Sequence, residues 1–199
     1  HELSSNDSES LTAATSYFAL ALELIAPVSK PALIAVGGRS GTGKSVLARS
    51  IACRIAPPPG AVVLRSDVIR KELAGVDALT RLPGAAYTRE SSDRVYGEML
   101  GRARSVLAQG CSAIVDAAFL TVAEREAATE IARSGGVDFH GLFLTAAPEI
   151  RVQRIGSRRA DASDASEAVA LSQEAIDLGA VDWPLIDASG MPEDPLAQA

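Results

Sequence analysis

One segment near the start of the chain constrains its fold more than any other. Residues 38–45 read Gly-Arg-Ser-Gly-Thr-Gly-Lys-Ser and match the pattern G-x-x-x-x-G-K-[ST]. An apolar run at 32–36 comes directly before this segment, and apolar residues at helical spacing follow over 44–55. A strand, a glycine-rich turn and a helix in this order form the context in which the pattern binds phosphate. We call residues 38–45 the P-loop and expect it to bind a nucleotide.

The residue types of the P-loop suit that task. Glycines allow a tight turn, so that backbone N–H groups converge on phosphate oxygens. Lys44 can reach the β- and γ-phosphates, and the hydroxyl of Ser45 can bind Mg²⁺. We therefore predict ATP and Mg²⁺ as cofactors. The residues expected to bind the nucleotide are Gly38, Ser40, Gly41, Thr42, Gly43, Lys44 and Ser45.

Strand-like and helix-like segments alternate through the rest of the chain. The apolar runs that predict strands are 32–36, 61–64, 112–115, 139–144 and 183–187. Pro184 requires an edge position for the last of them. A capping box at Thr121 and Glu124 and a proline at position 148 mark helix starts. The pattern predicts an α/β fold, a three-layer α/β/α sandwich over 32–188 with a mainly parallel five-stranded sheet.

The two ends of the chain differ from this domain in composition. We expect a disordered tail over 1–10, a helix over 11–26 that packs on the domain or leads in from a preceding one, and a flexible tail over 189–199. The apolar stretch 11–25 carries Glu23 and is shorter than the ~20 apolar residues of a membrane span. Because the chain opens with His1 rather than Met, we expect a processed product or a piece of a longer protein.

Charge and cysteine content narrow the class of function. The formal net charge is −6, which argues against a broad nucleic-acid footprint without excluding a local basic pocket. Cys53 and Cys111 match no zinc or redox motif and are typical of a reducing compartment. We therefore expect a cytoplasmic protein with no membrane partner.

Two carboxylates follow apolar strands and are candidates for the chemistry. Asp67 comes after the run 61–64, which we expect to lie beside the P-loop strand, so its carboxylate could accept a proton from an acceptor hydroxyl. Arg70 lies one turn later and could bind the acceptor or the γ-phosphate. Asp116 closes the run 112–115 and could hold Mg²⁺. The alternative for each carboxylate is a helix or turn cap.

A series of arginines forms the last candidate. Arg151, Arg154 and Arg158 share one face of an expected helix. Arginines on a mobile lid can neutralise charge on a moving phosphoryl group, and Arg154 and Arg158 are our choices for that role. The alternative is a solvated cationic face.

The motifs together resemble a known group of proteins. The matching segments are VGGRSGTGKSVLAR (36–49), LRSDVIRKEL (64–73), IVDAAFL (114–120), RADASDA (159–165) and GAVDWPLIDASG (179–190). They are similar to the P-loop kinase-like ATPase domains of the zeta-toxin, gluconate-kinase and polynucleotide-kinase group. They resemble more closely the C-terminal domain of bacterial fusion proteins whose N-terminal half is similar to aminoglycoside phosphotransferases. The resemblance spans roughly residues 17–190.

The resemblance implies a P-loop NTPase fold, nucleoside-kinase-like with a helical lid, and a kinase activity. Asp67 and Arg70 match the Asp-x-x-Arg of polynucleotide-kinase-like enzymes, in which the Asp is the proposed general base. The expected acceptor is a hydroxyl of a small molecule: a sugar, a nucleotide-sugar or an antibiotic-like compound. A polynucleotide 5′-hydroxyl and a non-catalytic, regulatory role beside a fused phosphotransferase-like domain remain alternatives. We expect the acceptor between Asp67 and the helix near Ser91, where Tyr87, Arg89 and Arg94 lie.

Overall fold

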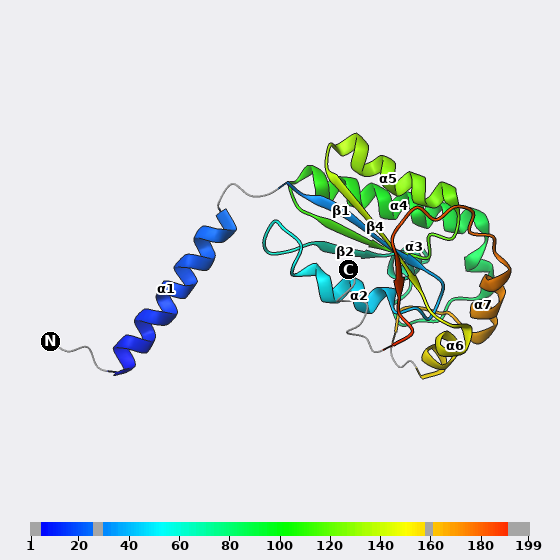
Figure 1. Ribbon diagram of the computed structural model, residues 1–199, viewed down its shortest axis with the longest axis horizontal. Coiled ribbons are helices and arrows are strands. Elements are labelled where there is room, and N and C mark those ends of the chain that lie inside the picture. Colours follow the sequence, from blue (N-terminus) through cyan, green and yellow to red (C-terminus); the bar gives the residue numbers. More distant parts are fainter. Residues whose placement is uncertain (1–4, 26–29, 158–160, 191–199) are drawn as a thin grey trace.

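The computed structural model describes residues 5–25, 30–157 and 161–190, and Figure 1 shows its elements. Within these ranges five strands form one parallel sheet: β1 (Ala32–Gly38), β2 (Val62–Arg65), β3 (Ala113–Asp116), β4 (Asp138–Thr145) and β5 (Leu185–Asp187). The α-helices are α1 (Ser5–Ile25), α2 (Lys44–Ala52), α3 (Ser66–Leu73), α4 (Arg89–Ala108), α5 (Val122–Gly135), α6 (Pro148–Ser157) and α7 (Glu167–Ser172). Two 3₁₀ turns, η1 (Gly84–Tyr87) and η2 (Gln173–Ala175), complete them.

Helices cover both faces of the sheet, as Figure 1 shows. The buried side chains of β1 alternate between the two layers. Leu33 belongs to the apolar cluster beneath α4 and α5, whereas Ile34 belongs to the cluster beneath α2. Such alternation on a sheet buried on both sides produces the continuous apolar run seen in the sequence. The three-layer α/β/α fold with a parallel sheet is confirmed.

The order of the strands is β2-β3-β1-β4-β5. The expectation that the strand before Asp67 lies beside the P-loop strand is therefore wrong, because β3 lies between them. An apolar run signals a buried strand but carries no information on its neighbours. The register nevertheless aligns the strand ends, since Asp116 pairs with Val36 of β1 on one side and with Arg65 of β2 on the other.

Local signals placed several helix ends correctly. Thr121 and Glu124 form the reciprocal capping box at the start of α5. Helix α6 begins at Pro148, and β5 is an edge strand that starts directly after Pro184. Helix α2 ends at Ala52, three residues before the end that the apolar spacing predicts.

The N-terminal helix differs from its prediction. It begins at Ser5, so residues 5–10 are helical rather than part of a disordered tail. Figure 1 shows α1 apart from the sheet, and its residues Leu11, Tyr17, Phe18, Leu20 and Leu22 are exposed, so these side chains do not pack on the domain, which was one of the two expected arrangements. Residues 191–199 of the predicted flexible tail lie outside the described residues. In the described part of the chain, every helix is too short or too polar to cross a lipid bilayer.

Candidate active site

A crevice of about 740 Å³ lies at the carboxyl ends of β1, β2 and β3. This is the edge at which open parallel sheets bind ligands. The sequence-predicted residues that line it are Ser40, Gly41, Thr42, Gly43, Lys44, Ser45, Asp67, Arg70, Asp116 and Arg154. Gly38 does not line it. Its N–H donates to Ala118 O, and a Cβ there would lie 2.4 Å from Leu144 O, so Gly38 serves the packing of the turn against β4.

The P-loop has the backbone conformation that its glycines predict. Gly41 and Gly43 have φ angles of +90° and +93°, a region that other residues rarely adopt. Thr42 is 1% exposed, and its hydroxyl donates to Arg39 O. The ammonium group of Lys44 also donates to Arg39 O, at 3.0 Å. The loop is thus held as a closed turn at the start of α2, where backbone N–H groups and the helix dipole favour a phosphate.

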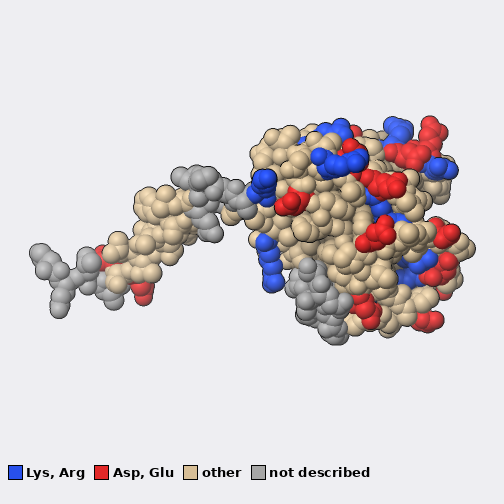
Figure 2. Space-filling model, turned by 45° about the horizontal axis from the view of Figure 1, so that its top comes forward, with Lys and Arg blue, Asp and Glu red and all other residues tan. Residues whose placement is uncertain are grey.

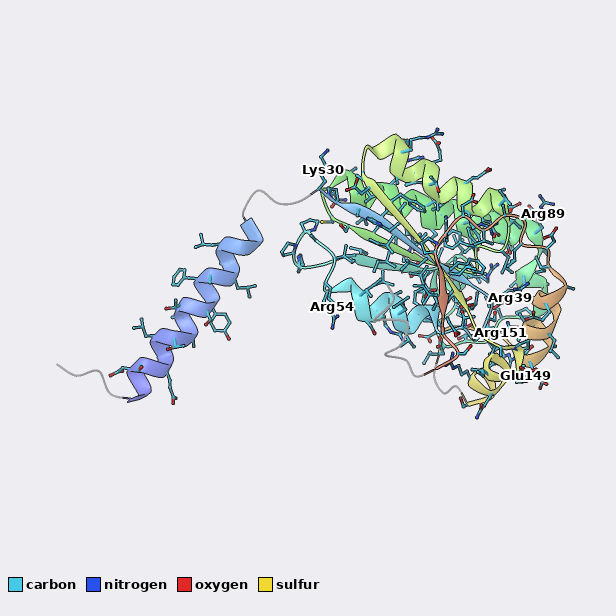
Figure 3. The ribbon with its side chains drawn as sticks, in the orientation of Figure 1. Lys30, Arg39, Arg54, Arg89, Glu149 and Arg151 are labelled. Atoms are coloured by element: carbon cyan, nitrogen blue, oxygen red, sulfur yellow. The ribbon has the colours of Figure 1, made fainter. Side chains whose placement is uncertain are left out.

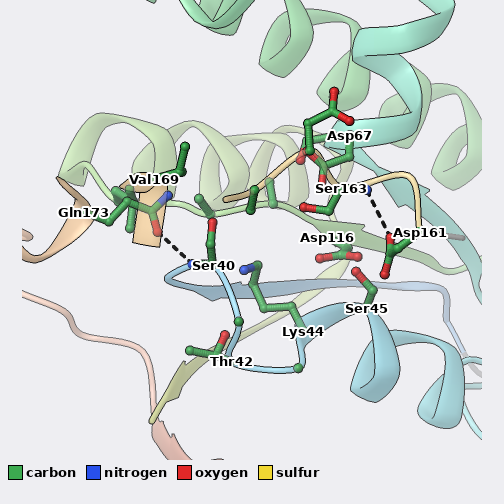
Figure 4. A pocket seen from close by; sticks show the side chains of 18 of the residues that line it. Ser40, Thr42, Lys44, Ser45, Asp67, Asp116, Asp161, Ser163, Val169 and Gln173 are labelled. Carbon is green, nitrogen blue, oxygen red and sulfur yellow. Dashed lines mark hydrogen bonds between the residues drawn. The ribbon is translucent and has the colours of Figure 1, made fainter. Parts of the chain in front are cut away.

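Asp67 lies in the first turn of α3, on the wall of the crevice that faces the P-loop (Figure 4). Because α3 begins at Ser66 with Arg65 as its N-cap, the alternative that Asp67 caps the helix is wrong. Burial raises the pKa of Asp67, although a hydrogen bond from Ser163 and the charge of Lys44 act in the opposite direction. A carboxylate with a raised pKa is a stronger proton acceptor than an ordinary one.

Asp116 lies at the floor of the crevice, near Ser45 in Figure 4. It is 4% exposed and lies 3.4 Å from Nε of Arg65, whose guanidinium also donates to Asp161 at 2.9 Å. Burial opposes the charge of Arg65, but these carboxylates raise its pKa.

The described residues contain no group of three His, Cys, Asp or Glu side chains that could hold a metal alone. One carboxylate and one hydroxyl beside a phosphate site suit Mg²⁺, which keeps waters and phosphate oxygens as its other ligands.

Arg70 of α3 lines the crevice and contacts both η1 and α4. It is 8% exposed, and its guanidinium donates to Ala86 O at 2.8 Å and lies 4.8 Å from the centre of the Tyr87 ring. Its Nε is buried and has no hydrogen-bond partner among the described residues. Arg70 therefore presents a fixed positive charge to the crevice. Arg89 and Arg94, expected in the same region, are exposed and do not line it.

The arginines of α6 behave differently from one another. Arg151 is 1% exposed and donates to Ser40 O of the P-loop, so a solvated cationic face is wrong for this residue. Burial and the charge of Arg39 lower its pKa. Arg154 lines the crevice, but its guanidinium donates to the carbonyls of Ala188 and Gly190 beyond β5. Arg158, the second predicted lid residue, lies outside the described residues.

The segment 161–165 lines the crevice beside Asp67, and the sequence patterns assign no role to it. Asp164 accepts hydrogen bonds from Lys71, from the N–H of Leu82 and from the hydroxyl of Tyr87. Although burial favours the neutral acid, these bonds lower the pKa of Asp164. Three donors from separate segments thus fix the position of Ser163 beside Asp67. The only signal in the sequence was the run RADASDA, which carries no helical or strand period.

Known proteins are similar in sequence to most of this chain. A family model described as an AAA domain matches residues 33–176. An uncharacterized protein of Mycobacterium tuberculosis and one of Mycobacterium bovis are each 33% identical to the chain over 178 residues. The match covers 84% of this chain and 34% of each relative, so the chain spans about a third of the length of these relatives.

Solved kinase structures share the fold. A gluconokinase from Sinorhizobium meliloti 1021 superimposes with a TM-score of 0.59 at 20% identity, over 84% of this chain and 89% of its own. A sugar kinase from Janibacter sp. HTCC2649 gives 0.61 at 19%, over 85% and 92%. The Mycobacterium tuberculosis APS kinase in complex with AMPPNP and APS gives 0.58 at 19%, over 85% and 94%. Together with the match over residues 33–176, the P-loop and the parallel sheet show that the chain belongs to the AAA-domain family of P-loop proteins.

Proposed function

We propose that this chain is an ATP-dependent phosphotransferase that moves the γ-phosphoryl group of ATP to a hydroxyl of a small molecule. The observation that carries the proposal is that Lys44 of the P-loop and Asp67 of α3 line the same crevice. The first is the residue that reaches the terminal phosphates, and the second is placed to accept a proton. A nucleotide-binding site without an acceptor site would not need a carboxylate on the wall of the crevice at that position.

Each group of residues in the crevice has a separate role in the proposed transfer. The P-loop amides and Lys44 bind the phosphates and neutralise charge that develops on them. Asp67 accepts the proton of the acceptor hydroxyl as its oxygen attacks phosphorus, and the bond to ADP breaks. Arg70 contributes a fixed positive charge on the acceptor side. Ser45 and Asp116 would hold Mg²⁺, which neutralises phosphate charge when it is bound.

The crevice suits a small acceptor: a sugar, a nucleotide-sugar or an antibiotic-like compound. Its volume of about 740 Å³ lies within the range of small-molecule sites. On the face shown in Figure 2, basic and acidic side chains alternate over the domain instead of gathering in a basic tract. A strand of nucleic acid requires a basic groove with stacking aromatic rings. A polynucleotide 5′-hydroxyl is therefore a less favoured acceptor.

The test is ADP release from ATP and Mg²⁺ in the presence of a panel of hydroxyl compounds, including sugars, nucleotide-sugars, aminoglycosides and a 5′-hydroxyl oligonucleotide. We expect one small-molecule class to stimulate ADP release and to gain the phosphoryl group by mass spectrometry. Lys44→Ala should lower the stimulated rate by about 10²–10³-fold, as loss of a charge-stabilising group does. Stimulation by no compound, or an unchanged rate in Lys44→Ala, would show that the proposal is wrong.

A second candidate is a nucleotide-binding module that regulates a further domain, since the relatives are longer than this chain. About two thirds of each relative lies outside the match. Such a module would change the partner's activity on binding nucleotide, without transferring phosphate itself. Asp67 separates the two candidates, since Asp67→Asn should strongly lower transfer by a kinase and leave a purely regulatory effect intact.

Ser163 offers a prediction on pH dependence. Asp67 must be ionised to accept a proton, so transfer should fall as pH decreases through its raised pKa. Because the hydrogen bond from Ser163 lowers that pKa, Ser163→Ala should raise it further and move the acidic limb of the pH–rate profile to higher pH. Ser105→Ala, on the exposed side of α4, is the matched control and should leave the limb in place. A limb that moves to lower pH, or does not move, would contradict this account.

A further inference from the structure

The side chain of Gln173 contacts the P-loop beside Lys44. Its Oε1 accepts a hydrogen bond from the N–H of Ser40 at 2.7 Å, the contact drawn in Figure 4. The carbonyl of the same peptide unit, Arg39 O, accepts the ammonium of Lys44 at 3.0 Å. The peptide unit between Arg39 and Ser40 therefore binds Lys44 through its carbonyl group and Gln173 through its N–H group, on opposite sides of the unit.

This contact fixes the orientation of the amide. A backbone N–H can only donate, so the atom that meets Ser40 N must be the carbonyl oxygen of Gln173. The NH₂ group, with two donors, is consequently on the other side of the amide. Gln173 lines the crevice, so a pair of hydrogen-bond donors is held at the margin of the phosphate site.

Two further contacts hold the segment with Gln173 against the P-loop, one through Arg39 and one through Arg151. Nε of Arg39 donates to the backbone carbonyl of Gln173 at 2.9 Å. The neighbouring Glu174 pairs with Arg151, and Arg151 also donates to Ser40 O. Figure 3 shows Arg39 and Arg151 on the side of the domain toward α6 and α7. Donors held in place before a ligand binds cost little reorganisation when it arrives.

The geometry points to the terminal phosphate. The N-terminus of α2 and the adjacent amides bind the inner phosphates of a P-loop nucleotide, whereas the lysine reaches the β- and γ-phosphates. Gln173 lies at the peptide that holds Lys44, on the side of the loop remote from α2. We propose that Gln173 binds the γ-phosphate through its NH₂ group while Oε1 stays on Ser40, so that α7 and η2 distinguish ATP from ADP. This inference rests on the proposed function.

The test compares the affinities of the full chain for AMPPNP and for ADP, each with Mg²⁺, by isothermal titration calorimetry. Gln173→Glu replaces a donor with an anion beside the γ-phosphate. It should weaken AMPPNP binding by at least about tenfold, as expected for loss of a hydrogen bond to a charged group, and should change ADP binding little. Gln173→Ala should weaken AMPPNP binding less, and ADP binding equally little. Gln109→Glu, an exposed residue at the end of α4, makes the same change in charge away from the crevice and should affect neither nucleotide.

The ratio of the two affinities within one variant controls for folding. Equal losses for AMPPNP and ADP would show that Gln173 supports the P-loop as a whole, and unchanged affinities would show no contact; either result overturns the inference. If the wild-type chain binds neither nucleotide, the proposed function and this inference fail together. If Gln173→Glu selectively loses AMPPNP while no acceptor is ever phosphorylated, this inference stands and only the transferase assignment fails.

Discussion

Asp67→Asn should lower phosphoryl transfer by about 10²–10⁴-fold, the range that a positioned general base contributes. The amide keeps the shape of the side chain and can still accept a hydrogen bond from Ser163, but it cannot take up the acceptor's proton. Nucleotide affinity should change little, because the P-loop is intact. The measurement is the rate of transfer to the acceptor found in the panel, with AMPPNP affinity measured in parallel.

Asp93→Asn is the matched control, since Asp93 is exposed on α4 and does not line the crevice. It makes the same change in charge and should retain the wild-type rate. As pH decreases, the wild-type rate should also begin to fall at a higher pH than an unperturbed carboxyl group would give, because burial raises the pKa of Asp67. If Asp67→Asn transfers phosphate at the wild-type rate, Asp67 is not the base, and the shared crevice would support nucleotide binding alone.

The parts of this site that the sequence predicts are those encoded by short-range patterns. The P-loop combines a strand, a turn that needs positive φ angles and a helix start within a few residues, so each signal supports the others. The same holds for the apolar runs of the strands and for the capping box at Thr121. These features depend on neighbours in the chain, which the sequence displays directly.

The strand order was not predictable in this way. Asp67 was placed in the crevice by the assumption that its strand adjoins the P-loop strand, and that assumption is wrong. Asp67 lines the crevice nevertheless, because all parallel strands end at one edge and α3 starts immediately after β2. The prediction of its position thus depended on the polarity of the strands and not on their order.

Contacts between distant segments account for what the sequence did not predict. Gln173 and Ser40 are 133 positions apart, and Asp164 gathers donors from three separate segments. A glutamine in a three-residue 3₁₀ turn has no periodicity that marks it as a ligand of a loop near the other end of the chain. The charge of Arg154 suggested a phosphate ligand, but charge alone does not distinguish a phosphate from the backbone carbonyls that it contacts here.

Gly41→Ala should damage the P-loop far more than the same change at Gly43. At φ +90° an alanine is strained, and its Cβ would lie 2.7 Å from Arg151 O and 2.9 Å from Arg151 Cα. The neighbour is backbone at the start of α6 and cannot move without displacing that helix. The strain of the left-handed region costs about 1–2 kcal/mol and the overpacking about 1–3 kcal/mol more.

Gly43→Ala separates the two causes. Gly43 has nearly the same φ, +93°, but a Cβ there meets no atom of the described residues within 4 Å. The melting temperature without nucleotide should therefore fall by only a few degrees in Gly43→Ala, at about 2–4 °C per kcal/mol, and by clearly more in Gly41→Ala. Gly41→Ala should also lose most of its affinity for AMPPNP, because Ser40 and its contacts to α6 and η2 must shift. Equal melting temperatures in the two variants would mean that α6 does not press on the P-loop as the structure indicates, and that the anchoring of Gln173 is looser than its hydrogen bonds imply.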